Sequence, residues 1–180
     1  MSERKHTCQS TNLKEATLPL RAWDIRQYVW DIGSGTFGPM ERMRALIYSL
    51  GIKTIAVLGG KKHIPLRGKC RRTPILTLDL KQGELVEVRS QNEILATLDS
   101  LGRNRGLVFN AEMLKYCGKK YRVARRVDQM INEKSGRMRK LSNTVILEGV
   151  TCNGKAHGGC QRSCYSLWRE IWLKRAKDAR

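Results

Sequence analysis

The sequence has few acidic residues, few histidines and no long apolar run. These shortages argue against an acidic protein, a histidine-based catalytic centre and a membrane-spanning helix. It contains 16 Asp and Glu against 35 Lys and Arg, which gives a formal net charge of +19. Nowhere do about 18 apolar residues follow one another, so we expect no helix that spans a membrane. The polar start of the chain also lacks the apolar core of a secretory signal, which predicts a cytoplasmic protein.

Residues that would build a catalytic centre are scarce. The three histidines are His6, His63 and His157, and none has a sequence neighbour that indicates a catalytic triad. The glycines at 33–38 lack the Lys-Ser/Thr pair of a phosphate-binding loop. A thiol enzyme with Cys160 as nucleophile and His157 as base is the weakest alternative. The sequence therefore favours a non-catalytic protein.

The excess of positive charge indicates a polyanionic partner. A surface this basic repels itself unless it meets nucleic acid, an anionic membrane face or an acidic protein. The cations also come in clusters, which favours direct contact over a merely solvated surface. The residues predicted to bind a polyanion are Lys61, Lys62, Arg67, Lys69, Arg71, Arg72, Lys119, Lys120, Arg122, Arg125, Arg126, Arg137, Arg139 and Lys140.

Composition divides the chain into three predicted parts. Residues 1–60 form an N-terminal appendage, residues 61–76 a basic linker or arm, and residues 77–180 a cysteine-bearing barrel domain. In the appendage, apolar residues recur at helical spacing over 39–50, which predicts an amphipathic helix. Peripheral contact of this helix with a membrane is a further alternative to plain core packing.

The barrel domain is predicted to be α+β, with a small, bent antiparallel sheet or barrel. Strands are expected at 84–90, 120–131 and 139–152, where β-branched and other apolar residues predominate or alternate with polar ones. The glycine-containing turn between the last two strands makes them a hairpin.

Two helices are expected in this domain. Residues 90–93 have the form of a capping box, which predicts a helix over 91–101 inserted after the first strand. Trp168 and Trp172 lie at helical spacing in the last segment, which predicts a C-terminal helix over 160–176 that closes one end of the barrel.

The cysteines are the candidate ligands of a metal centre. In a reducing compartment the six cysteines indicate metal ligands or reactive thiols and not disulfides. Cys160 and Cys164 are four residues apart, which on a helix would bring two thiolates to one metal. Cys117 and Cys152 precede turns that can fold them toward this pair, and His157 can replace one sulfur. We expect one zinc ion or one iron–sulfur cluster, unless these cysteines are ordinary core residues.

Several segments resemble, in their amino-acid sequence, a widespread group of small uncharacterised bacterial proteins. The segments are GELVEVRS, EILATLD, LEGVTC and WREIWL, and the resemblance covers most of the chain. It implies a bacterial source and a compact barrel with a cysteine site, and no activity is known to transfer from the group.

Two functions from different classes remain open. The first is a non-catalytic, metal-stapled basic module that contacts a polyanion, with nucleic acid as the favoured partner. With few aromatic residues it would contact phosphates more than bases, so its affinity would fall steeply with salt. The alternative is an iron–sulfur protein that transfers electrons to a partner enzyme, with the basic surface docked on an acidic face.

Overall fold

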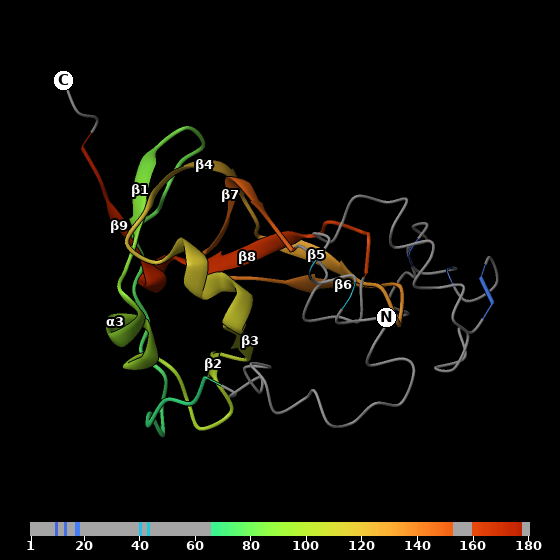
Figure 1. Ribbon diagram of the computed structural model, residues 1–180, viewed down its shortest axis with the longest axis horizontal. Helices are drawn as coiled ribbons and strands as arrows, with labels where there is room; N and C mark the ends of the chain where they lie inside the picture. The colour runs from blue at the N-terminus through green and yellow to red at the C-terminus, as the bar shows by residue number, and fades with distance from the viewer. Residues whose placement is uncertain are drawn as a thin grey trace, which may run out of the picture. The chain divides into compact units, whose positions relative to one another are not determined.

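Figure 1 shows the protein as a computed structural model of the whole chain. The structure describes residues 66–152 and 160–177, together with the single residues 10, 13, 17, 18, 40 and 43. The rest of the predicted appendage, including most of its helix over 39–50, lies outside the described residues. Residues 66–152 and 164–177 belong to one compact unit, which we call the half-barrel unit, and residues 160–163 belong to a second.

The half-barrel unit consists mostly of strands, and a curled antiparallel sheet of five strands forms its centre (Figure 1). The strand order is β8 (Tyr165–Arg169), β7 (Thr144–Thr151), β4 (Lys120–Arg126), β1 (Leu85–Val88) and β9 (Leu173–Arg175). The two edge strands β8 and β9 are separated in the chain only by the 3-10 turn η4 (Glu170–Trp172). Because one short segment supplies both edges, the sheet has to curl. This confirms the predicted bent antiparallel sheet.

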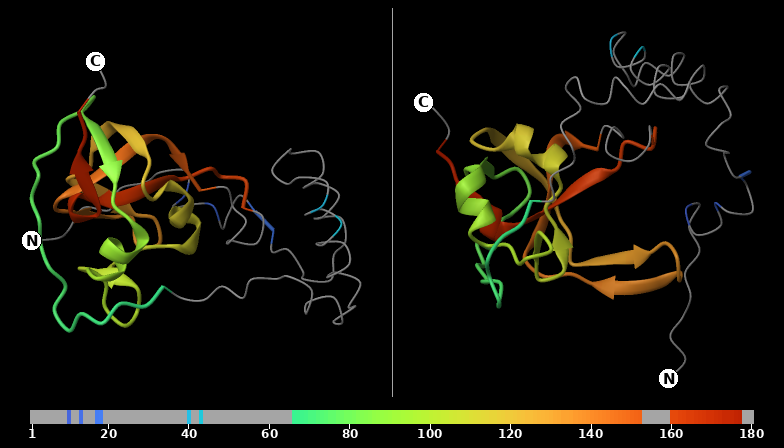
Figure 2. Two further views of the ribbon diagram at one scale, coloured as in Figure 1. Left: turned by 60° about the vertical axis from the view of Figure 1, so that its left-hand side comes forward. Right: turned by 60° about the horizontal axis from the view of Figure 1, so that its bottom comes forward.

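Short ribbons and helical turns complete the unit. They are the ribbon of β2 (Arg103–Asn104) and β3 (Leu107–Val108), the ribbon of β5 (Gln129–Asn132) and β6 (Arg137–Lys140), the helix α3 (Gln91–Leu95) and the 3-10 helix η2 (Ala111–Tyr116). The predicted strands over 120–131 and 139–152 are therefore each split in two. The chain leaves the sheet after β4, in which the register shifts between Val123 and Arg125, and it returns at Asn143, which has a positive φ of 50° directly before β7. The ribbon β5–β6 consequently projects from the sheet (Figure 2).

The inserted helix is present but shorter than predicted. Ser90 and Glu93 form the expected capping box, in which the Ser90 N–H donates to Oε2 of Glu93 at 2.9 Å. The helix ends at Leu95 and not at residue 101. The Asp99 carboxylate accepts hydrogen bonds from two backbone N–H groups downstream, which favours a turn over further helix.

The predicted C-terminal helix over 160–176 is wrong, because residues 165–175 form β8, η4 and β9. β8 pairs with β7, so that Trp168 lies opposite the buried Val145. The turn η4 then brings Trp172 into the same core. Two tryptophans four residues apart therefore share one core although they do not lie on an α-helix. Pairing with strands whose inner faces were already apolar overrode the local helical pattern.

The core lies inside the curl of the sheet and is centred on two tryptophans. Trp168 and Trp172 are fully buried, and the Phe109 ring meets them edge-on at centroid distances of 6.0 and 5.2 Å. The indole N–H of Trp172 donates to Oγ1 of Thr97 at 3.1 Å. This hydrogen bond fixes the turn after α3 to the core.

A buried carboxylate holds the segment before β1 against η4. Glu170 is fully buried, and its oxygens accept the backbone N–H groups of Leu78, Asp79 and Leu80 at 2.7, 3.2 and 3.0 Å. Nη1 of Arg126 donates to the same carboxylate at 2.8 Å and compensates its charge. Every oxygen of this buried group is therefore satisfied, as a buried charge requires.

Candidate nucleic-acid interface and cysteine sites

In the described part of the predicted basic arm, residues 66–76, the segment around Gly68 and Cys70 lies against the turn that follows α3. The N–H of Gly68 donates to the Asp99 carbonyl at 2.9 Å, and the N–H of Cys70 donates to the Leu98 carbonyl at 3.0 Å. A side chain at residue 68 would overlap the Leu98 carbonyl oxygen, so this close approach requires glycine. The exposed cations of the arm are Arg67, Lys69, Arg71 and Arg72.

The tip of the β2–β3 ribbon extends this positive surface. The N–H of Arg105 donates to Oγ1 of Thr73 at 3.1 Å, which joins the tip to the end of the arm. Arg169, at the end of β8, also holds this tip, because its Nη2 donates to the Arg105 carbonyl at 3.0 Å. Arg103 and Arg105 are both exposed. We did not predict them as interface residues, because only this tertiary contact joins their loop to the arm.

We call the exposed cations of the arm and of this tip the arm surface. The acidic residues of the β1–β9 edge are paired locally, Glu84 with Arg175 at 2.8 Å and Glu87 with Lys174 at 2.9 Å. Within the described residues no ion pair reaches the arm surface. Its members are Arg67, Lys69, Arg71, Arg72, Arg103 and Arg105.

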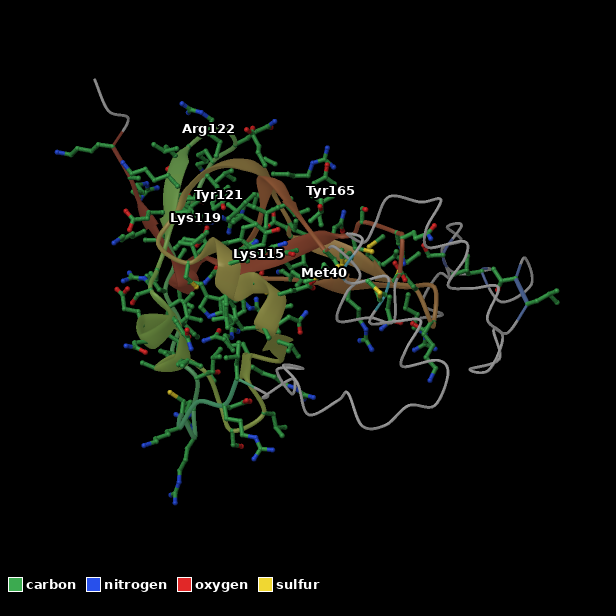
Figure 3. All side chains as sticks on the ribbon, viewed as in Figure 1. Met40, Lys115, Lys119, Tyr121, Arg122 and Tyr165 are labelled. Atoms are coloured by element: carbon green, nitrogen blue, oxygen red, sulfur yellow. The ribbon has the colours of Figure 1, made fainter. Side chains whose placement is uncertain are left out.

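The other predicted polyanion-binding residues lie on β4, directly before it, on β6 or outside the described residues. Figure 3 shows Arg122, which lies on β4, and Lys119, which directly precedes that strand. The exposed residues of this group are Lys119, Lys120, Arg122, Arg125, Arg137, Arg139 and Lys140. Lys61 and Lys62 are among the residues that the structure does not describe.

Arg126 differs from the other predicted interface residues, because it is engaged within the fold. Its guanidinium lies 2.8 Å from Glu170 and 3.0 Å from Asp128. Burial by itself would lower the pKa of Arg126, but the hydrogen bonds and charges of these two carboxylates raise it above its ordinary value. Arg126 therefore stabilises the fold, and we take it out of the proposed interface.

Tyrosines and Lys115 lie near the end of η2, which contacts the end of β7. The rings of Tyr116 and Tyr121 pack edge to face at 5.7 Å, and Nζ of Lys115 lies 4.7 Å from the centre of the Tyr116 ring. The Tyr116 hydroxyl donates to the Thr151 carbonyl at 3.1 Å. Tyr165 lies opposite Thr151 and is 60% exposed (Figure 3). An aromatic face beside a lysine suits an unpaired nucleobase next to a phosphate.

Cys152 and Cys164 are neighbours at the ends of β7 and β8. The N–H of Cys152 donates to the Cys164 carbonyl at 2.7 Å, which continues the register of Thr151 opposite Tyr165. The Cα atoms of directly opposite residues in an antiparallel pair are about 5 Å apart. The structure therefore brings two of the predicted ligands together, through strand pairing and not through the predicted helix.

The remaining candidate ligands are not assembled with this pair in the described part of the chain. Cys117 packs against the core, and burial raises the pKa of its thiol. Cys160 is exposed and belongs to the second unit, and His157 lies outside the described residues. Among the residues that the structure describes, no group of three or more His, Cys, Asp or Glu side chains is placed to hold a metal ion.

The fold and this surface define a small antiparallel β protein with an exposed cationic face. In comparisons with known proteins, no family model, no curated protein and no solved structure matches this chain. The resemblance to a group of bacterial proteins therefore stays a prediction. In the described residues, no helix has the length and apolar character that crossing a bilayer would need.

Proposed function

We propose that this protein is a non-catalytic nucleic-acid-binding module that contacts phosphates through the arm surface. The observation that carries the proposal is a row of exposed cations on a backbone that hydrogen bonds hold in place. Gly68 and Cys70 donate these bonds at 2.9 and 3.0 Å, and the cations between and after them take part in no ion pair among the described residues.

A fixed row of cations suits a phosphate backbone for two physical reasons. Binding releases the counterions that the phosphates hold, and this release favours association without any base contact. A backbone that is already ordered also loses less conformational entropy on binding than a flexible basic tail would. The arm surface combines both features, with a formal net charge of +19 on the whole chain to attract the polyanion.

The test is a titration of labelled DNA and RNA with the full-length protein at a series of salt concentrations. We expect log K to fall linearly with log salt, with a slope that reports the number of phosphates contacted. The variant Arg71→Gln/Arg72→Gln should lower this slope by about 2 if each arginine meets one phosphate. An affinity that does not change with salt would eliminate the proposal.

A matched control separates the arm from general loss of charge. Lys81→Gln/Lys174→Gln removes the same charge from two lysines that pair with Asp79 and Glu87 at 2.7 and 2.9 Å. We expect this control to keep the salt dependence of the unmodified protein. Equal weakening by both double variants would show that the arm is not the interface.

We propose separately that Cys152 and Cys164 bind a metal, either zinc or an iron–sulfur cluster. The proposal is supported by the hydrogen bond of 2.7 Å between the Cys152 N–H and the Cys164 carbonyl, because directly opposite residues of an antiparallel pair extend their side chains to the same face of the sheet. Anaerobic purification, elemental analysis and an absorption spectrum provide the test. Zinc in a colourless protein or iron with visible absorption would support the site, and protein that takes up neither metal would overturn it.

A further inference from the structure

The β5–β6 ribbon is a projecting element that the core does not need. Its four residue pairs run from Gln129 opposite Lys140 to Asn132 opposite Arg137, and the Leu141 N–H donates to the Asp128 carbonyl at 2.8 Å at its base. An isolated ribbon of two strands is marginally stable in water by itself. Figure 2 shows that this one points away from the sheet. A ribbon that no other described strand or helix covers suits a partner that encloses it.

The two faces of the ribbon differ in their chemistry, because directly opposite residues share one face. Ile131 and Met138 lie opposite each other on one face, which also carries the pair Gln129 and Lys140. The other face carries the pairs Met130–Arg139 and Asn132–Arg137, and all of its residues are exposed. Arginine and asparagine are the side chains that pair bidentately with guanine and adenine in the major groove of DNA.

A groove lies between the β5–β6 ribbon and the neighbouring strands β4 and β7 of the sheet. Its volume is about 770 Å³, and it is lined by apolar side chains, by cations of both elements and by Asp128, whose carboxylate is paired with Arg126 at 3.0 Å. Its lining includes Arg125, Val127, Met130, Met138, Lys140 and Ile146. Arg125 and Lys140 are exposed, and within the described residues neither takes part in an ion pair. Such a groove suits a sugar-phosphate backbone, with phosphates on the cations and sugars against the apolar side chains.

The dimensions of the ribbon match B-form DNA. Two paired strands are about 4.8 Å apart, and the ribbon extends roughly 13 Å from Asp128 to Asn132 at about 3.3 Å per residue. The major groove of B-form DNA is about 12 Å wide and about 8.5 Å deep and admits a two-stranded ribbon. The major groove of A-form RNA is too deep and narrow for side chains to read.

We infer that the β5–β6 ribbon enters the major groove of duplex DNA, while one DNA strand lies in the groove between the ribbon and the sheet. The inference rests on the proposed function and deepens it, because it names the nucleic acid and the element that reaches the bases. Arg139 contacts base edges, and Arg125 and Lys140 contact phosphates. The ribbon thereby adds base contact to an interface that the arm surface supplies only with phosphate contact.

The experiment is a footprint of the full-length protein on a DNA duplex of mixed sequence with dimethyl sulfate, which methylates guanine N7 in the major groove. We expect the protein to protect guanine N7. Arg139→Ala should abolish this protection and weaken duplex binding about tenfold. Arg139→Lys should not restore the protection, because lysine keeps the charge but lacks the bidentate guanidinium. The control Lys81→Gln should leave the footprint intact.

The outcomes separate this inference from the proposed function. If the protein binds DNA with the expected salt dependence but leaves guanine N7 reactive, the ribbon inference fails and the proposed function stands. Equal or tighter binding of an RNA duplex or of single-stranded DNA also overturns the ribbon inference alone. If no nucleic acid binds at any salt concentration, both fail.

Discussion

The most stringent test of the fold concerns the buried carboxylate of Glu170. The variant Glu170→Gln keeps the shape of the side chain but replaces one accepting oxygen by an NH₂ donor. If that donor takes the position of Oε2, it faces the N–H groups of Leu78 and Asp79, which lie 2.7 and 3.2 Å from that oxygen. In the other orientation it faces the Leu80 N–H and the guanidinium of Arg126. Either orientation sets a donor against two donors.

The magnitude follows from the bonds that are lost. A hydrogen bond to a charged group contributes about 1.5–3 kcal/mol, and removal of one partner of a buried ion pair destabilises by about 3–5 kcal/mol. Part of this loss is offset because no charge is then buried, so we expect Glu170→Gln to lower the free energy of unfolding by about 3 kcal/mol. At a urea m-value of about 1.5 kcal/mol per molar, the midpoint of unfolding should fall by about 2 M.

Urea unfolding followed by tryptophan fluorescence measures this change, because Trp168 and Trp172 are fully buried. The control is Glu87→Gln, which removes a partly exposed ion pair with Lys174 and should change the free energy of unfolding by no more than about 1 kcal/mol. The reasoning is refuted if Glu170→Gln destabilises by less than about 1 kcal/mol, or if the two variants are indistinguishable.

Three further predictions concern the arm, the thiols and the helix cap. Gly68→Ala should weaken nucleic-acid binding and destabilise the protein by about 1–3 kcal/mol, measured by titration and urea unfolding, because its Cβ would overlap a carbonyl oxygen. Cys117 should react with iodoacetamide more slowly than the exposed Cys164, as mass spectrometry can follow, because burial raises its pKa. The pKa of Glu93 should be about 2 by NMR titration, because the Ser90 hydroxyl and N–H donate to it, and Ser90→Ala should return it toward 4.5. Since this pKa is lowered by folding, the stabilisation from ionised Glu93 is present above about pH 4.5 and is lost as the pH falls toward 2.

Local patterns predicted the elements whose causes are local. The capping box at Ser90 and Glu93 marks the start of α3 correctly, because its hydrogen bonds join residues three apart in the chain. The turn between β5 and β6 and the strand at β1 were predicted for the same kind of reason. The end of α3 was not, since it depends on contacts made beyond the helix.

The C-terminal segment shows why spacing alone misleads. Trp168 and Trp172 fit one face of a helix, but they equally fit a strand, a tight turn and a second strand that deliver both rings to one core. The choice depends on the open edges of β7 and β1, which lie some 20 and 85 residues earlier in the chain and are invisible in a local window. The same pairing, and not a helix, places Cys164 beside Cys152.

The sequence by itself determined the charge of this protein, the presence of a bent antiparallel sheet and the position of its helix cap, because composition, alternation and capping act between near neighbours. Only the tertiary structure decided which cations remain exposed and which, like Arg126, form an ion pair with a buried carboxylate. It also joined the tip at Arg105 to the arm and set Cys152 against Cys164. These arrangements depend on hydrogen bonds and packing between segments far apart in the chain, which no single stretch of residues contains.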